Sequence, residues 1–154
     1  MNSALNHFTK FESKELGSKL IESALSYKAD PRKDISKGTG KRIGCIFLNP
    51  SLRTRVSTQL AAQNLGMEPI VLNMDKEGWA LEMKEGAIMN KGTVEHIKDA
   101  AGVLGSYFDI LAIRAFPTLT NREEDINDFA FGQFVKYSGK PVISLESAIR
   151  HPLQ

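Results

Sequence analysis

Four short runs of almost continuously apolar, β-rich sequence constrain the fold of this chain more than any other feature. Short apolar runs that do not alternate with polar residues are typical of strands covered on both faces. Stretches with helical signals separate the runs, which predicts βαβ units with right-handed crossovers. We therefore predict an α/β fold whose parallel sheet has about four strands flanked by helices. The runs are Arg42–Asn49, Pro69–Asn73, Asp109–Ala115 and Pro141–Leu145.

Capping residues and breakers mark the helices expected between these runs. Ser13 is the expected cap of a first helix. The segment Arg53–Leu65 lacks proline and glycine and stops at Gly66, a common signal for a helix end. Thr93 is the expected cap of a third helix, and Asn121, followed three residues later by a glutamate, is the expected cap of a fourth. The stretch 74–92 is predicted to be one long loop, and loops of this length are usually functional or mobile.

The composition fits one globular domain and argues against several classes of partner. The chain has 154 residues, and its hydrophobic content of 42% allows a packed core. Its formal net charge of +2 is too small for a nucleic-acid-binding or membrane-binding surface, so no nucleic acid and no membrane is expected as a partner. The basic stretch 31–42 is interrupted by an acid and by glycines, which favours a solvated loop over a binding patch.

The N-terminus and the single cysteine indicate the expected compartment. No apolar run approaches the roughly 20 residues of a membrane span, and the first ten residues lack a signal-peptide core. Cys45 cannot form an internal disulfide and lies in an apolar run, so we expect it to be a small buried hydrophobe. The default expectation is a cytoplasmic protein.

The segment from Phe47 to Arg55 lies where the first predicted strand passes into a helix. A helix N-terminus presents unpaired N–H groups and the positive end of a dipole, which together favour anions. Ser51 and Thr54 add hydroxyl donors, and the planar guanidinium of Arg53 suits phosphate oxygens. Serine and threonine also cap ordinary helices, so this chemistry alone leaves phosphate binding and a simple helix start equally supported. The P-loop pattern is missing.

Other polar residues follow the later strands and are expected at the same edge of the sheet. Open parallel sheets bind ligands at the carboxyl ends of their strands. Arg114 lies near the end of the third run, and His151 and Gln154 follow the fourth. A lone arginine at a strand end is more typical of a surface residue, and a terminal His-Pro-x-Gln means little by itself. Together with the Ser-x-Arg-Thr turn they predict an anion site.

Two motifs and the arginine between them resemble those of the carbamoyltransferases. Ser51–Arg55 resembles the Ser-x-Arg-Thr-Arg motif of that family, and His151–Gln154 resembles its His-Pro-x-Gln motif, with Arg114 at a matching spacing between them. The resemblance covers nearly the whole chain. It is strongest to the branch that uses N-acetylornithine or N-succinylornithine, through Leu52, the segment Trp79–Glu82 and the segment Glu146–Arg150.

The resemblance implies a reaction and a role for each motif residue. The δ-amine of the acceptor would attack the carbamoyl carbon of carbamoyl phosphate and phosphate would leave, without a metal, a cofactor or a covalent enzyme intermediate. His151 and Gln154 would hold the carbamoyl group. Arg53, Thr54, Arg114 and His151 would stabilise the developing charge. The phosphate would be held by Ser51, the backbone of Leu52, Arg53, Thr54 and Arg114.

The same resemblance implies how the acceptor binds and how the chain assembles. The Trp79 loop would reach into the site of a neighbouring subunit, which implies a homotrimer. Glu146 would meet the α-amino side of the acceptor or its amide, and Phe116 would line the acyl pocket. Val94 stands where acetyl users carry glutamate and the succinyl user carries proline. Because valine removes a carboxylate that would repel a succinyl group, it slightly favours succinyl. Without the resemblance, Trp79 and Phe116 would be read as ordinary packed aromatics.

The resemblance also bears on domain organisation. It implies a second α/β domain that carries the remaining acceptor-binding residues, and no segment up to Gln154 matches that domain. We therefore expect residues 1–154 to be the carbamoyl-phosphate-binding domain alone, with little or no turnover in isolation. The chain would then be a piece of a longer protein, a broken gene product or half of a split protein. Two alternatives stay open: a domain of an ordinary ornithine carbamoyltransferase, and a non-catalytic module for anion binding or assembly.

Overall fold

A parallel sheet forms the centre of the molecule in a computed structural model that describes residues 7–8, 13–74, 79–89 and 92–148. The strand order is β1-β7-β6-β2-β3, and every neighbouring pair is parallel. The predicted parallel α/β sheet is confirmed, since four of its strands are the four apolar runs. The strand that sequence reasoning did not predict is β1, at one edge. The strands are β1 (His7–Phe8), β2 (Arg42–Phe47), β3 (Glu68–Asn73), β6 (Ile110–Arg114) and β7 (Val142–Glu146).

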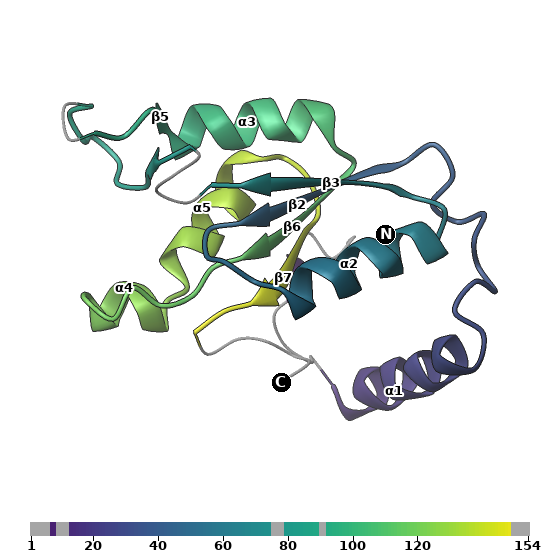
Figure 1. Ribbon diagram of the computed structural model, residues 1–154. Coiled ribbons are helices and arrows are strands. Elements are labelled where there is room, and N and C mark those ends of the chain that lie inside the picture. The colour runs from purple at the N-terminus through teal and green to yellow at the C-terminus, as the bar shows by residue number, and fades with distance from the viewer. Residues whose placement is uncertain (1–6, 9–12, 75–78, 90–91, 149–154) are drawn as a thin grey trace.

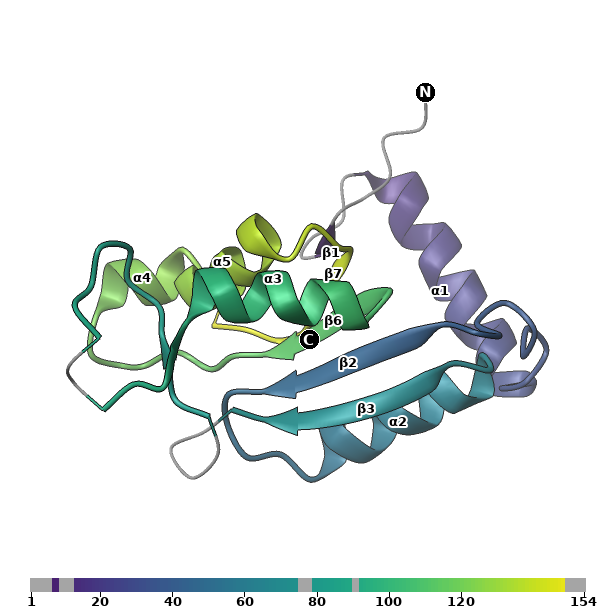
Figure 2. The ribbon, with the colours of Figure 1, turned by 90° about the horizontal axis from the view of Figure 1, so that it is seen from above.

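Helices cover both faces of this sheet (Figure 1, Figure 2). The helices α3 (Ile97–Tyr107) and α5 (Phe129–Tyr137) pack on one face, and α2 (Arg53–Asn64) packs on the other. The helix α1 (Lys14–Ala29) buries none of its residues and lies away from the carboxyl ends of the strands in both views. Within the described ranges, no helix has the length and apolar character needed to cross a membrane.

The core is divided between the two faces by the alternation of side chains along each strand. On the face of α3 and α5, Ile46 and Ile113 pack with Phe134. On the face of α2, Cys45 and the neighbouring-strand residue Ala112 belong to a second cluster. Cys45 is fully buried and free, as expected, and its burial raises the pKa of the thiol to about 11.

Two of the predicted helix boundaries are confirmed with their caps. The hydroxyl of Ser13 accepts a hydrogen bond from the backbone N–H of Leu16 at 3.1 Å, and α1 begins at the next residue. The helix α2 ends at Asn64, and Gly66 follows with a φ of 77°. A Cβ at Gly66 would lie 2.0 Å from the carbonyl oxygen of Ile35, so this turn requires glycine for its backbone and for its close approach.

The third helix begins later than predicted. Thr93 is not its cap, because His96 takes that position: the Nδ1 of His96 accepts from the N–H of Lys98 at 3.1 Å. Residues Glu95–His96 form β5, which pairs in parallel with β4 (Leu81–Glu82). The predicted long loop therefore contains a short strand and is joined to a second one. This small sheet lies beyond the carboxyl ends of the main strands (Figure 1).

The single helix predicted after Asn121 is two helices in the structure. Asn121 caps α4 (Arg122–Ile126) as expected, and its Oδ1 accepts from the N–H groups of Glu123 and Glu124. The helix then stops, and α5 starts after Asp128, which adopts a φ of 49° in the left-handed region. The side chain of Glu124 forms an ion pair with Lys84 at 3.4 Å.

Candidate functional site

The carboxyl ends of β2, β6 and β7 meet at one edge of the sheet because the three strands are parallel. Phe47 pairs with Arg114, and Arg114 pairs with Glu146 across a register shift that skips Leu145. The backbone continues this contact beyond the strands, since the N–H of Leu48 donates to the carbonyl of Arg114 at 3.0 Å. The turn before α2 therefore lies directly beside the end of β6.

Arg114 is buried at this edge, with 6% of its surface exposed, and it is bonded on two sides. Its Nε donates to Oε2 of the half-buried Glu146 at 2.8 Å, which forms an ion pair. Its Nη1 donates to the carbonyl oxygens of Asn49 and Pro50, at 3.1 and 2.7 Å. The ring of Phe116 stacks on the guanidinium, with 3.9 Å between Cζ and the ring centroid. These contacts fix one cationic group against the turn that leads into α2.

That turn presents an uncapped helix N-terminus. Leu52 occupies the cap position of α2 and offers no side-chain acceptor, and the residue is 80% exposed. The first N–H groups of α2 are therefore not satisfied by a side-chain cap and can donate to an anion. Arg53 is the exposed first residue of the helix, and Ser51 and Thr54 are half-buried around it. Asn49 also holds the turn, because its Oδ1 accepts from the N–H of Phe116 at 2.8 Å.

Arg55, the last residue of the Ser51–Arg55 motif, contacts the neighbouring strands. Its Nη2 donates to Oδ1 of Asn73 at 2.6 Å, and its guanidinium lies 5.1 Å from the ring of Phe47. These contacts attach the first turn of α2 to the end of β3, so Arg55 orients the turn.

The structure brings the five expected phosphate residues to one edge of the sheet. Ser51, Leu52, Arg53 and Thr54 form one turn, and Arg114 donates to the carbonyl of the residue that precedes it. Arg53 and Arg114 therefore lie at the same edge of the sheet. Phe116 and Glu146 adjoin Arg114 through a ring stack and an ion pair. His151 and Gln154 lie outside the described residues.

Trp79 and Val94 flank the small β4–β5 sheet and do not belong to this turn. The Nε1 of Trp79 donates to Oε2 of Glu95 at 2.8 Å, and the N–H of Val94 donates to the carbonyl of Ala80 at 2.8 Å. Both side chains are exposed. Their hydrogen-bond partners, Glu95 and Ala80, also lie in or beside the β4–β5 sheet.

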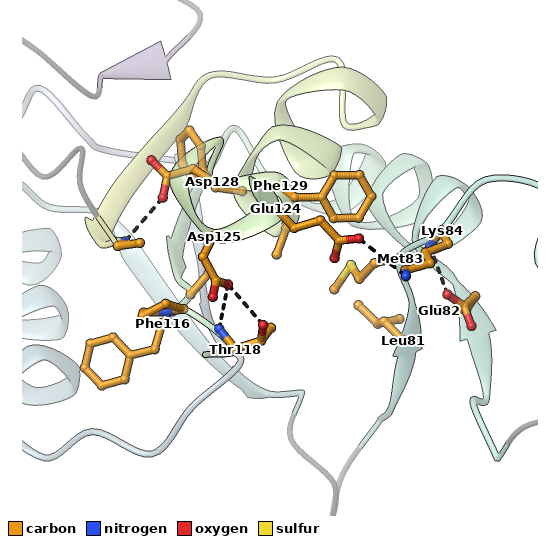
Figure 3. Close-up of a pocket in the computed structure, with 15 residues that line it drawn as sticks. Leu81, Glu82, Met83, Lys84, Phe116, Thr118, Glu124, Asp125, Asp128 and Phe129 are labelled. Carbon is orange, nitrogen blue, oxygen red and sulfur yellow. Dashed lines mark hydrogen bonds and ion pairs between the residues drawn. The ribbon is translucent and has the colours of Figure 1, made fainter. Parts of the chain in front are cut away.

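A pocket of about 220 Å³, which sequence reasoning missed, lies next to the strand ends (Figure 3). Its lining combines apolar side chains such as Leu81 and Met83 with carboxylates from α4 and the α4–α5 turn. The carboxylate of Asp125 accepts from the N–H groups of Thr118 and Leu119, and the first of these bonds holds its pKa below the ordinary value. The ring of Phe116 points away from Asp125 in Figure 3. This ring is the one that stacks on the guanidinium of Arg114.

Within the described ranges, no group of three or more His, Cys, Asp or Glu side chains is placed to hold a metal ion. The candidate site instead offers cationic and N–H donors. Such donors can bind an anionic oxygen and stabilise charge that develops on it.

The fold and this edge define an open parallel α/β domain with an anion-binding helix N-terminus. A family model described as the carbamoyl-phosphate-binding domain of aspartate/ornithine carbamoyltransferases matches residues 5–154. The chain belongs to this family of enzymes, as its motifs predicted.

Curated relatives and solved structures agree with the family model. An N-succinylornithine carbamoyltransferase of Bacteroides fragilis is 46% identical over 140 residues, which cover 91% of this chain and 44% of the relative. An N-acetylornithine carbamoyltransferase of Xylella fastidiosa is 40% identical over 154 residues, covering 98% of this chain and 45% of the relative. Acetylornithine transcarbamylase complexed with acetylcitrulline superimposes with a TM-score of 0.85 at 38% identity, over 95% of this chain and 43% of that one. The chain thus spans less than half the length of these relatives.

Proposed function

We propose that this chain binds carbamoyl phosphate at the turn before α2. The observation that carries the proposal is the double anchoring of Arg114, whose Nη1 donates to Asn49 and Pro50 and whose Nε donates to Glu146. These bonds hold a guanidinium beside an uncapped helix N-terminus. A dianionic phosphate suits such a site, because arginine and backbone N–H groups both form short charge-assisted hydrogen bonds with its oxygens.

The proposed activity of the whole protein is carbamoyl transfer to the δ-amine of an N-acylated ornithine. The amine nitrogen attacks the carbamoyl carbon, the bond from that carbon to the phosphate oxygen breaks, and the proton lost by the amine ends on the departing phosphate. Arg53, Thr54 and Arg114 would stabilise the departing phosphate and the carbonyl oxygen. His151 and Gln154 would hold the carbamoyl group. Because the chain spans less than half of its relatives, the other acceptor-binding groups would come from a second domain.

Succinylornithine is the acceptor we favour over acetylornithine. By the resemblance, Val94 stands where acetyl users carry glutamate, and valine leaves no carboxylate to repel a succinyl group. Acetylornithine transcarbamylase variants in which one glutamate is replaced by serine, proline, valine or alanine are complexed with N-succinyl-L-norvaline. The relatives with 46% and 44% identity from two Bacteroides species are N-succinylornithine carbamoyltransferases, which supports the same choice.

We also propose a homotrimer in the cytoplasm that serves arginine biosynthesis. Trp79, Val94 and Ile88 are exposed on one segment near the β4–β5 sheet, although each is a large apolar side chain. A neighbouring subunit whose site received this segment would cover them, as the resemblance implies for Trp79. Light scattering on the purified protein measures the oligomeric state directly.

A substrate panel tests the proposed activity. The chain is joined to the remaining part of the Bacteroides fragilis relative, and product formation is measured with ornithine, N-acetylornithine and N-succinylornithine. We expect the highest kcat/KM with N-succinylornithine. A preference for free ornithine would support an ordinary ornithine carbamoyltransferase instead. Binding of carbamoyl phosphate without any transfer would support a non-catalytic anion-binding module.

A further inference from the structure

Asn49 joins the turn before α2 to the end of β6 with both its side chain and its main chain. It is half-buried and lies two residues after the end of β2 and two residues before Ser51. Its Oδ1 accepts from the backbone N–H of Phe116 at 2.8 Å, and its carbonyl oxygen accepts from Nη1 of Arg114 at 3.1 Å. The two partners are 67 and 65 residues away in the sequence, so these bonds form only in the folded chain.

The other residues of this turn offer no comparable side-chain link. Pro50 and Leu52 have no polar side-chain atom, and the hydroxyl of Ser51 makes no hydrogen bond within the described chain. The first turn of α2 has no side-chain cap either. Among the described residues, Arg114 alone would therefore bond residues 49–52 to the end of β6 if the Asn49 side chain were removed.

The same contacts determine which donor of Arg114 is left for a ligand. A guanidinium has five N–H donors, and here Nε bonds Glu146 while Nη1 bonds the carbonyls of Asn49 and Pro50. Nη2 makes no hydrogen bond with any described residue, although Arg114 is buried. Because an unpaired donor on a buried side chain is costly, an acceptor brought by the ligand is favoured at Nη2. Asn49 bonds this guanidinium directly, and through the N–H of Phe116 it also holds the residue whose ring lies on the guanidinium.

We propose that Asn49 is a positioning residue for carbamoyl phosphate, because it fixes the turn before α2 and the guanidinium of Arg114 relative to each other. This inference rests on the proposed function and deepens its binding site. A ligand that accepts from the N–H groups of the turn and from Nη2 of Arg114 then meets donors that are already in place, so less affinity is lost to ordering them. Asn49 acts through these groups.

Asn49→Ala tests this role, because it removes Oδ1 and leaves the main-chain carbonyl that accepts from Arg114. Calorimetry on the 154-residue chain should show an affinity for carbamoyl phosphate about three- to tenfold lower, the range expected when one hydrogen bond no longer holds the site. Amide hydrogen exchange at Phe116, measured by NMR, should be slow in the unsubstituted chain. It should be faster in the variant, because this N–H loses its acceptor.

Asn121→Ala is the matched control for a loss of stability alone. Asn121 also accepts backbone N–H bonds through its Oδ1, but it does so at the start of α4, and it bonds neither the turn before α2 nor Arg114. Removing this cap should lower the melting temperature and leave the affinity for carbamoyl phosphate unchanged.

A double-mutant cycle with Arg114→Lys shows whether Asn49 acts through Arg114. Lysine keeps the positive charge, so weaker binding should remain measurable, but it lacks the planar fork that bonds the turn and Glu146 together. Asn49→Ala should therefore reduce the affinity by a smaller factor in the Arg114→Lys chain than in the unsubstituted chain.

Several results would overturn the proposal. Fast exchange of the Phe116 amide in the unsubstituted chain would remove the bond on which the role depends, whether or not Asn49→Ala folds. An unchanged affinity in Asn49→Ala, an equal loss in Asn121→Ala, or the same factor of loss with arginine and with lysine at position 114 would leave Asn49 a structural role only. If the unsubstituted chain showed slow exchange at Phe116 but no binding of carbamoyl phosphate, the proposed function would fail first, and the positioning role with it.

Discussion

Arg114 shows how one side chain can organise a site formed by three strand ends. Its guanidinium bonds the turn after β2 on one side and Glu146 on the other, and it carries the ring of Phe116 on its face. Lysine has no planar fork and could not make these contacts at once. The position therefore depends on the shape of arginine as well as on its charge.

We predict that Arg114→Lys lowers the free energy of unfolding by about 1–3 kcal/mol, because carbonyl and carboxylate acceptors at a buried position lose their donors. Urea denaturation measures the change. Arg53→Lys is the matched control, because Arg53 is exposed, and it should change stability by less than about 0.5 kcal/mol. Equal effects of the two substitutions would contradict the structural role of Arg114.

Cys45 gives a prediction for the pH dependence of stability. Burial raises the pKa of its thiol to about 11 from an ordinary value of 9.0, so the folded chain keeps the proton longer than the unfolded chain does. The contribution of the buried thiol is fully present below pH 9.0 and is lost as the pH rises toward about 11. Urea denaturation across this window should show a steeper fall of stability for the unsubstituted chain than for Cys45→Ala. Equal slopes would contradict the assignment.

The predictability of the elements follows from the range of the interactions that form them. The four main strands were predictable because both faces of each are covered, so each strand is an almost continuous apolar run in the sequence. Ser13 and Asn121 were predictable because a cap bonds N–H groups within three residues. The phosphate turn was predictable as a motif for the same local reason.

Other features depend on contacts that are distant in the sequence. The break at Asp128 is fixed by bonds to Ser147 and Ala148, and the late start of α3 is fixed by the pairing of β5 with β4. No local sequence pattern indicates either of these contacts. The pocket beside Phe116 was missed for the same reason, since its lining comes from separate segments that meet only in the folded chain.

A substitution at Gly66 tests how tightly the turn after α2 is packed. Its φ is positive, and a Cβ at this position would approach the carbonyl oxygen of Ile35 to 2.0 Å. We therefore predict that Gly66→Ala lowers the free energy of unfolding by more than about 1 kcal/mol. Gly132→Ala is the opposite control, because Gly132 lies inside α5 with nothing within 4 Å of a Cβ, and it should stabilise the chain by about 0.5–1 kcal/mol. Thermal and urea denaturation measure both, and a neutral Gly66→Ala would show that the turn is not tightly packed.

At the scale of the whole molecule, the layers explain why the site lies where it does. A fully parallel sheet sends all its strands toward one edge (Figure 1). That edge collects the turn before α2, Arg114 and Glu146. The opposite edge carries the basic turn 30–41, which precedes β2. The residues that we propose bind the ligand thus lie at the end of the sheet opposite to this basic turn.

Calorimetric titration with carbamoyl phosphate tests the central claim most directly, using the unsubstituted chain, Arg53→Ala and the control Arg32→Ala. Arg53 is exposed at the start of α2, and Arg32 is exposed in the basic turn before β2, so neither substitution should unfold the chain. We predict saturable binding to one site, weakened about tenfold or more by Arg53→Ala and unchanged by Arg32→Ala. Absence of binding, or an equal loss in both variants, would contradict an anion site at this strand edge.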